Sequence, residues 1–254
     1  MERTYKNFKI IIKDDYDGAS AVAADIITGF ITANPACVLG LATGSTPEGT
    51  YAKLIEAYRA GKADFSRIAT FNLDEYHPIE ATNSQSYKYY MHDKLFNHIN
   101  INSRANAHLP NGEATDPDAE CTAYEAKIAA AGGIDLQLLG IGFNGHIGFN
   151  EPAPAFSKVT HYVALDASTI AANARFFDNP GQVPKHALTM GIGTIFGAKQ
   201  ILLMVTGAAK ADIIEKAIFG DINPHLPASV LQLHSNVTLV MDAAAATKVV
   251  AQLR

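Results

Sequence analysis

The stretch Leu138–Pro152, LLGIGFNGHIGFNEP, decides how the fold of this chain is interpreted. It begins within an apolar run, Leu136–Ile141, that is typical of a buried strand. Glycines at 140, 142, 145 and 148 break the run and let the backbone approach a ligand closely. Polar side chains lie among and after these glycines, namely Asn144, His146, Asn150 and Glu151. Because α/β proteins place their chemistry in loops at the carboxyl ends of strands, we expect a functional site here.

The same glycines match a dinucleotide-binding pattern. Residues 140–145 fit GxGxxG, and Asp166 lies at a plausible distance along the chain for a ribose contact. That fingerprint requires a helix to begin at the glycines, whereas Pro152 and Pro154 follow and disfavour one. We therefore expect no nicotinamide or flavin cofactor. A glycine-rich turn that only hydrogen-bonds His146 is the plainer alternative to a functional site.

Length and charge restrict the class of protein. The chain has 254 residues, of which 48% are hydrophobic, and its formal net charge is −5. This length accommodates one large α/β domain, and no linker, repeat or charged block divides it, which favours a single domain over residues 1–254. The negative charge argues against a nucleic acid as partner, since such binding needs a basic face.

The cysteines and the first residues indicate the compartment. Cys37 and Cys121 are too few for a disulfide scaffold, and MERTYKNFKIII lacks the shape of a signal peptide. No segment reaches the length of a membrane span. We therefore expect a cytoplasmic protein without a membrane partner. The nine histidines show no compact ligand spacing such as HExxH, so no metal is expected.

Strand and helix patterns alternate along the chain. Strands are predicted at Phe8–Ile12, Cys37–Ala42, Ile68–Leu73, Leu136–Ile141, Val159–Leu165, Gln200–Thr206 and Val237–Met241. Helices are predicted at Asp17–Ala33, Pro47–Tyr58, from Ser84 to about His98, at Asp118–Ala131, from Ser168 through Phe177, from Gly207 to Phe219 and after Asp242. The glycine-broken segment Pro184–Gly197 gives no clear pattern. The alternation predicts a mostly parallel sheet covered on both faces.

A short polar loop follows the second predicted strand; it consists of Thr43, Gly44, Ser45 and Thr46. Thr46 is a good N-cap and Pro47 a good first residue for the next helix. Free backbone N–H groups and the positive end of the helix dipole would then face the loop, which suits an anion. It is not a Walker A loop, because no lysine follows its glycine. A plain capped turn is the alternative interpretation.

Two acids, Asp74 and Glu75, follow the third predicted strand, at the sheet edge where the Thr43–Thr46 loop is expected. Adjacent side chains of an extended backbone point in different directions, so at most one should face a site. A solvated acidic turn is the alternative. The helix that Ser84 is expected to cap carries Tyr87 on an aromatic and apolar face, interpreted as core or lid.

Two cations follow later segments. Lys210 would lie in the first turn of a helix, where a lysine opposes the helix dipole and therefore suggests a bound anion. Arg175 is either an ordinary surface charge or an anion clamp. Together with the acids and His146, these groups indicate a cytosolic enzyme that moves protons on a small phosphorylated metabolite.

The chain resembles the isomerising glucosamine-6-phosphate deaminases of the glucosamine/galactosamine-6-phosphate isomerase family over nearly its whole length. The resemblance rests on five stretches: LGLATGSTPEGTY (39–51), TFNLDEYHPI (70–79), SQSYKYYMHDKLF (84–96), LLGIGFNGHIGFNEP (138–152) and ARFFDN (174–179). It implies a modified Rossmann-like α/β/α sandwich. It also implies conversion of glucosamine 6-phosphate and water to fructose 6-phosphate and ammonia without a cofactor, in amino-sugar catabolism.

The resemblance further implies roles for individual residues. Asp74 would take the C2 proton of the sugar and return it at C1, and an exposed Asp would be ionised near neutral pH without tuning. His146 would assist ring opening as either a proton donor or a proton acceptor, and Asn144 and Glu151 would support it. The phosphate group would bind to Thr43, Gly44, Ser45, Thr46, Arg175 and Lys210.

Two departures from the family pattern qualify this assignment. Asn144 stands where some members have Asp, and because an amide cannot take a proton, Glu151 would be the only acid of the ring-opening group. The long regulated members have a basic cluster for an allosteric amino sugar, which residues 154–163 largely lack. We therefore expect weak or absent activation by N-acetylglucosamine 6-phosphate, and either a monomer or a homo-oligomer.

Two rival functions are less consistent with the residues. A 6-phosphogluconolactonase would need the Gly-His loop for ester hydrolysis but no C2 base, so FNLDEY argues against it. A non-catalytic sugar-phosphate sensor should have lost Asp74 or His146 and would usually carry a DNA-binding domain. Neither feature applies to this sequence.

Overall fold

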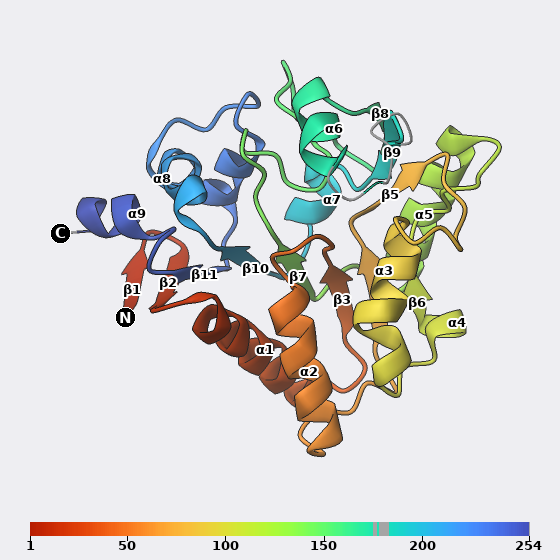
Figure 1. Ribbon diagram of the computed structural model, residues 1–254, viewed down its shortest axis with the longest axis horizontal. Coiled ribbons are helices and arrows are strands. Elements are labelled where there is room, and N and C mark those ends of the chain that lie inside the picture. Colours follow the sequence, from red (N-terminus) through yellow and green to blue (C-terminus); the bar gives the residue numbers. More distant parts are fainter. Residues whose placement is uncertain (175–176, 178–182, 254) are drawn as a thin grey trace.

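The computed structural model describes residues 1–174, 177 and 183–253. At its centre is an eight-stranded sheet with the order β1-β2-β11-β10-β7-β3-β4-β6 (Figure 1). In that order the strands are Glu2–Tyr5, Phe8–Lys13, Val237–Asp242, Gln200–Val205, Leu136–Leu139, Val38–Leu41, Ala69–Asn72 and Ala107–His108. Neighbouring strands are parallel except for β1 and β2. The predicted α/β fold with a mostly parallel sheet is confirmed.

Helices flank the sheet on both sides. α1 (Tyr16–Ala33) and α2 (Glu48–Arg59) pack together on one side, and α8 (Ala211–Phe219) lies on the other (Figure 1). The other α-helices are α3 Tyr87–Lys94, α4 Ser103–Asn106, α5 Pro117–Ala130, α6 Ala167–Asn173, α7 Ile192–Phe196 and α9 Thr247–Gln252. Short 3-10 turns are η1 Phe96–His98, η4 Ala208–Lys210 and η5 Pro227–Leu233.

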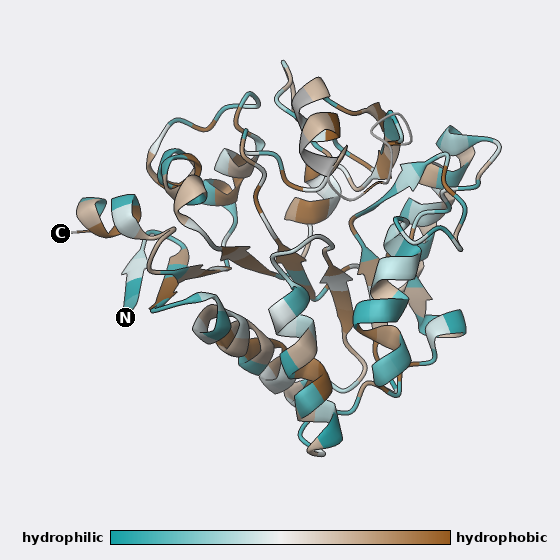
Figure 2. Cartoon of the chain, viewed as in Figure 1, coloured by the Kyte–Doolittle hydropathy of each residue, from teal (hydrophilic) through white to brown (hydrophobic). Residues whose placement is uncertain are grey.

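The apolar pattern of the sequence explains this layering. Along α1, every fourth residue is buried against the sheet, at Ala19, Ala23, Ile27 and Ile31. Full burial of one isoleucine side chain stabilises the fold by about 1.5–3 kcal/mol. Figure 2 shows the same contrast for the molecule, with apolar central strands and more polar outer helices. Within the described residues, no helix combines the length and apolarity needed to cross a membrane.

A second, antiparallel sheet was not anticipated from the sequence. It has the order β5-β9-β8 and is formed by Asp74–His77, His186–Thr189 and His161–Ala164. Leu73 alone separates β4 from β5. Its N–H donates to the carbonyl of Leu41 at 3.0 Å, and its own carbonyl accepts from the N–H of Met190 at 2.7 Å. The chain therefore passes from the large sheet into the small one at a single residue, immediately before Asp74.

Helix α2 begins one residue later than predicted. Its N-cap is Pro47, without a side-chain hydrogen bond, and Thr46 is not the cap. The phenol oxygen of Tyr16 acts in place of a capping side chain, because it accepts from the N–H of Gly49 at 2.8 Å. One N–H group of the helix terminus is thus already occupied by the protein itself.

Two other predicted caps were also wrong. Helix α3 is capped by Ser86 rather than Ser84, since the Ser86 hydroxyl accepts from the N–H of Tyr89 at 3.0 Å. Asp242 does not cap α9, whose N-cap is Ala246. The carboxylate of Asp242 instead accepts from the N–H groups of Ala245 and Gly207, and these bonds connect the end of β11 to the turn after β10.

Candidate active site

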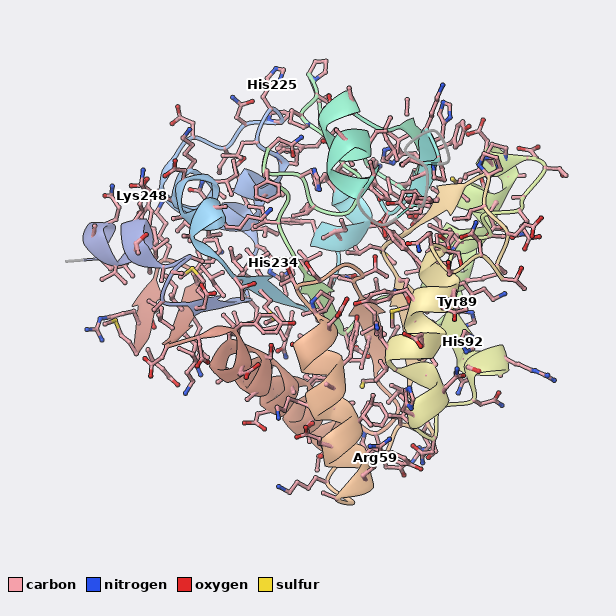
Figure 3. The ribbon with its side chains drawn as sticks, viewed as in Figure 1. Arg59, Tyr89, His92, His225, His234 and Lys248 are labelled. Atoms are coloured by element: carbon pink, nitrogen blue, oxygen red, sulfur yellow. The ribbon has the colours of Figure 1, made fainter. Side chains whose placement is uncertain are left out.

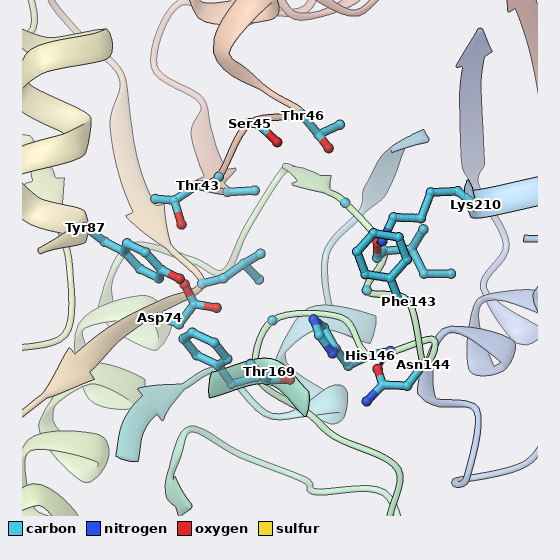
Figure 4. Close-up of a pocket in the computed structure, with 18 residues that line it drawn as sticks. Thr43, Ser45, Thr46, Asp74, Tyr87, Phe143, Asn144, His146, Thr169 and Lys210 are labelled. Atoms are coloured by element: carbon cyan, nitrogen blue, oxygen red, sulfur yellow. Dashed lines mark hydrogen bonds between the residues drawn. The ribbon is translucent and has the colours of Figure 1, made fainter. Parts of the chain in front are cut away.

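A pocket of about 440 Å³ lies at the carboxyl ends of β3, β4, β7 and β10 (Figure 4). This is the edge of an open parallel sheet where ligands usually bind. The loops that form it bring together most of the predicted site residues, namely Thr43, Gly44, Ser45, Thr46, Asp74, Asn144, His146 and Lys210. Glu151 lies behind His146 rather than in the pocket wall, and Arg175 lies outside the described residues.

Tyrosine side chains hold the backbone carbonyl groups of the Thr43–Thr46 loop. The carbonyl oxygen of Gly44 accepts from the phenol of Tyr90 at 2.7 Å. The carbonyl oxygens of Ser45 and Thr46 share the phenol of Tyr16, at 3.0 and 3.1 Å. Because these electron-rich oxygens are engaged by tyrosines, the hydroxyl and N–H groups of the loop are the ones left to meet an anion.

Lys210 lies on the right of the pocket in Figure 4, beside Phe143. Its Nζ donates to the carbonyl of Ile141 at 2.8 Å and lies 3.5 Å from the centroid of the Phe143 ring. Lys210 is the N-cap residue of α8, so its charge stands at the positive end of the helix dipole, as the sequence suggested. A cation held in this unfavourable position attracts an anion to the same place.

Asp74 is buried, which corrects the expectation of an exposed and untuned carboxylate. Only 6% of the residue is exposed, because β5 pairs with β9 and places Asp74 opposite Thr189. Burial, with the nearby charge of Glu75 as a smaller cause, holds the pKa of Asp74 well above its ordinary value. The alternative of a solvated acidic turn is likewise excluded. One acid of the pair faces the pocket, as predicted.

Tyr87 lines the pocket, although the sequence did not identify it as a site residue. It projects from the start of α3 into the pocket, with its hydroxyl end next to Asp74 (Figure 4). Its ring stacks on Phe149, with centroids 6.0 Å apart and planes inclined by 8°. Burial is the largest cause that keeps its pKa well above the usual value, so the phenol stays neutral and can donate a hydrogen bond.

His146 stands opposite Asp74 and is paired with Glu151 (Figure 4). Its Nδ1 lies 3.3 Å from Oε2 of Glu151, which leaves Nε2 for a ligand. Asn144 donates to the same carboxylate oxygen at 2.6 Å, and its Oδ1 accepts from the backbone N–H of His146. Thr169 of α6, which the sequence did not single out, donates to Oε1 of Glu151 at 2.5 Å.

These contacts fix the charge of Glu151. Burial raises the pKa of this carboxyl, but the hydrogen bonds and charge of His146, Thr169 and Asn144 outweigh it, and the pKa lies below its ordinary value. The carboxylate is therefore ionised near neutral pH. An ionised partner orients the imidazole.

The glycines of the loop are required by close packing. A Cβ on Gly142 would lie 2.3 Å from the ring of His146, and one on Gly148 would lie 2.9 Å from the hydroxyl of Thr189. The Thr189 hydroxyl also accepts from the N–H of Phe149 at 3.0 Å. Residues 140–150 form turns rather than a helix, so the GxGxxG match lacks the structure that a dinucleotide site needs.

Away from the pocket, His77 of β5 and His186 of β9 lie opposite each other, and both contact the ring of Tyr162. Within the described residues, no group of three His, Cys, Asp or Glu side chains is arranged to hold a metal ion. Figure 3 shows His92, His225 and His234 far from one another. His234 is buried, and its Nε2 contacts the carbonyl of Ala198 at 2.8 Å, which is a structural role.

Known proteins match both the sequence and this fold. The family described as glucosamine-6-phosphate isomerases/6-phosphogluconolactonase matches residues 15–240. Glucosamine-6-phosphate deaminase of Clostridioides difficile is 52% identical over 240 residues, covering 94% of this chain and 96% of that protein. The enzyme of the same name from Lachnoclostridium phytofermentans is 55% identical over 232 residues, covering 91% of this chain and 98% of that protein.

Solved structures agree. A monomeric glucosamine-6-phosphate deaminase superposes with a TM-score of 0.91 and 46% identity, covering 94% of this chain and 99% of that one. The 6-phosphogluconolactonase of Thermotoga maritima has a TM-score of 0.74 and 20% identity, covering 92% and 99%, and this likeness concerns the fold alone. The family model matches most of the length of this chain, and the two relatives are about half identical to it in sequence. The chain therefore belongs to the glucosamine-6-phosphate isomerase/6-phosphogluconolactonase family.

Proposed function

We propose that this protein converts D-glucosamine 6-phosphate and water to D-fructose 6-phosphate and ammonia. The observation that carries the proposal is the arrangement of two proton carriers across one pocket. Asp74 stands on one side of the pocket and His146 on the other, with the Thr43–Thr46 loop above both in the view of Figure 4, and Glu151 pairs with His146 from behind. The relatives named glucosamine-6-phosphate deaminase support this reaction at about 50% identity.

The phosphate group binds to the Thr43–Thr46 loop, with Lys210 completing the site. The loop supplies uncharged hydrogen-bond donors, and Tyr16 and Tyr90 engage its carbonyl oxygens so that these do not face the phosphate. Lys210 supplies the positive charge. Arg175 is proposed as a further phosphate ligand on the sequence alone. Binding at one end leaves the amino-bearing carbon to reach toward Asp74.

Ring opening begins at His146. Nε2 removes the proton of the O1 hydroxyl and delivers a proton to the ring oxygen, which gives the open-chain aldehyde. Glu151 stabilises the imidazolium between these transfers, because its carboxylate is ionised and 3.3 Å from Nδ1. Asn144 and Thr169 hold Glu151 in place.

Asp74 then moves the proton that isomerises the sugar. Its carboxylate removes the proton on C2, and the electrons form a C1–C2 double bond while the aldehyde oxygen gains a proton. Return of the proton at C1 leaves a C2 imine, which water hydrolyses to the ketone and ammonia. The raised pKa of Asp74 suits both transfers, since a stronger base abstracts a carbon-bound proton more readily.

The chain is proposed to act in the cytoplasm on a free sugar phosphate, without a cofactor, a nucleic acid or a membrane. The similarity to a monomeric deaminase supports a monomeric state. Residues 154–163 carry Lys158 but no basic cluster, which supports weak or absent activation by N-acetylglucosamine 6-phosphate. Activity without that sugar is the corresponding expectation.

The test measures ammonia and fructose 6-phosphate released from glucosamine 6-phosphate in the same reaction. One set of reactions lacks N-acetylglucosamine 6-phosphate and a second contains it. Equal amounts of both products without the acetylated sugar would support the proposal. A folded protein that yields neither product in either set would refute it, and hydrolysis of 6-phosphogluconolactone by that protein would point to the lactonase instead.

A further inference from the structure

Glu75, the neighbour of Asp74, points away from the pocket and is buried, with 2% of the residue exposed. Its Oε1 accepts from the N–H groups of Tyr76 at 2.9 Å and Tyr87 at 2.8 Å, and its Oε2 accepts from the N–H of Lys88 at 2.8 Å. A buried carboxylate with three backbone donors is a specific arrangement rather than a surface charge.

Two of these donors belong to the first turn of α3. Tyr87 and Lys88 are its first residues, and Ser86, as N-cap, accepts from the N–H of Tyr89. Glu75 and Ser86 therefore satisfy three N–H groups that a helix terminus otherwise leaves unpaired. The negative charge of Glu75 also lies at the positive end of the helix dipole.

The same helix carries the aromatic wall of the active site. The Tyr87 ring lines the pocket beside Asp74, and Glu75 bonds to the backbone N–H of that very tyrosine (Figure 4). One carboxylate thus joins the strand that presents Asp74 to the helix that presents Tyr87. A change at Glu75 would alter both the place of Tyr87 and the charge next to Asp74.

We propose that Glu75 is a positioning residue of the reaction, which holds Tyr87 against Asp74 and places a negative charge beside the Asp74 carboxyl. The inference rests on the proposed role of Asp74 in the deaminase reaction. Glu75 does not touch the substrate pocket, so its contribution passes through Tyr87 and Asp74.

The surrounding charges determine which acid keeps a proton. Burial raises the pKa of Glu75 to about 7, while its three N–H donors and the Lys88 charge oppose this rise. Asp74 is faced by Tyr87 from α3 and Tyr124 from α5, both kept neutral by a pKa well above the usual value. The charge of ionised Glu75 hinders ionisation of Asp74.

The decisive variant is Glu75→Gln, which keeps the size of the side chain and removes its charge. The acid limb of the pH profile of kcat/KM reports the base of the free enzyme. We expect this limb to move to lower pH by about one unit, because one nearby negative charge has been removed. We also expect kcat at the optimum to fall, since a weaker base removes the C2 proton more slowly.

Two matched variants separate charge from helix capping. Ser86→Ala removes the other cap of α3 without a change of charge, so it should lower the melting temperature and leave the acid limb in place. Glu80→Gln removes a charge from an exposed residue five positions along, and should change neither quantity. An acid limb in Glu75→Gln that coincides with that of the wild type, or that moves equally in Ser86→Ala, would overturn the proposal.

A measurement on the wild type covers the case in which Glu75→Gln does not fold. Carbon NMR of the side-chain carboxyls should show Asp74 and Glu75 titrating as a coupled pair, each with two steps. Independent single-step titrations would contradict the inference. Absence of deaminase activity in the folded wild type would instead refute the proposed function, so the two failures are distinguishable.

Discussion

At the scale of single residues, the candidate site depends on where each ionisable group is buried. Only 6% of the Asp74 residue is exposed to solvent, and the carboxylate of Glu151 is hydrogen-bonded to three side chains. These environments move their pKa values in opposite directions, up for Asp74 and down for Glu151. In the proposed mechanism, two acids of similar intrinsic strength thereby have different roles, Asp74 as a proton carrier and Glu151 as a permanent anion.

Asp74→Asn should lower kcat by about 10²–10⁴-fold, the range for removal of a positioned base. An amide cannot accept the C2 proton, so exchange of that proton with solvent should be lost together with turnover. Both quantities can be followed by proton NMR in deuterated buffer. Retention of more than a tenth of the wild-type kcat would remove Asp74 from the role of base.

Lys210→Ala should mainly weaken substrate binding. Loss of one charge-assisted hydrogen bond costs about 1.5–3 kcal/mol, which corresponds to a rise in KM of roughly 10- to 100-fold. Lys216→Ala on the exposed side of the same helix is the matched control and should leave KM unchanged. Steady-state kinetics measure both, and an unchanged KM in Lys210→Ala would exclude Lys210 from the phosphate site.

The buried Glu75 also affects stability, with a definite sign. Its pKa is about 7 in the folded protein against an ordinary value of 4.5. Between these values the folded state holds a proton that the unfolded chain has released, so stability falls as pH rises from about 4.5 to 7. At about 1.4 kcal/mol per pKa unit, the loss is on the order of 3 kcal/mol.

Urea unfolding at several pH values measures this loss. The wild type should lose free energy of unfolding across the interval, whereas Glu75→Gln should lose clearly less. Glu80→Gln, which changes an exposed carboxyl, serves as control and should follow the wild type. Parallel pH dependences for the wild type and Glu75→Gln would contradict the assignment of a raised pKa to Glu75.

The sequence predicted the residues of the site better than their surroundings. That Asp74, His146 and Lys210 line one pocket could be predicted because each follows a strand of the large sheet, and parallel strands end at one edge. The burial of Asp74 could not be predicted, since it depends on pairing with Thr189, far along the chain. Tyr87 occupied a helical aromatic face, a pattern that core residues share, and Thr169 carried no motif.

At the scale of elements, the proposed phosphate loop is shaped by two neighbouring helices. Tyr16 at the start of α1 and Tyr90 in α3 bond the carbonyls of residues 44–46. Helices α1 and α3 therefore both hold the Thr43–Thr46 loop, although no residue of this loop belongs to either helix. Because a carbonyl turned into the pocket would repel a phosphate, the two phenols select the backbone orientation that binds it.

Tyr16→Phe and Tyr90→Phe should each raise KM by roughly 2- to 10-fold with little change in kcat. The reason is the loss of hydrogen bonds, each worth about 0.5–1.5 kcal/mol, that hold the loop rather than the reacting atoms; Tyr90 makes one with Gly44, and Tyr16 also accepts from the N–H of Gly49. Tyr89→Phe, an exposed neighbour on α3, is the control. A fall in kcat at constant KM would show that these tyrosines act on the chemistry and not on the loop.

The elements themselves were predicted unevenly. The long helix α1 and the buried strands of the large sheet were predicted to within one or two residues, because their apolar patterns are continuous. The small sheet was not recognised. β9 lies in the glycine-broken segment 184–197, and β5 follows β4 after one residue, so no turn signal separates them.

At the scale of the whole molecule, the large and small sheets meet at Leu73. This residue donates to Leu41 of the large sheet and accepts from Met190, which directly follows β9. Neither sheet can move as a rigid body without displacing the backbone next to Asp74. The proposed base therefore stands where the two sheets are joined, while His146 lies in a loop and Lys210 ends the short turn η4 that leads into α8.

This junction has a consequence for amide hydrogen exchange. Leu73 lines an open pocket, where rapid exchange of its N–H would ordinarily be expected, and the N–H of Met190 donates to the carbonyl of Leu73. Because each is bonded across the junction, at 3.0 and 2.7 Å, they should exchange as slowly as the central strands, whereas the N–H groups of Phe143 and Asn144 should exchange rapidly. Fast exchange at Leu73 would show that the sheets part in the native state. Slow exchange would mean that the support of Asp74 opens only when the large sheet itself unfolds.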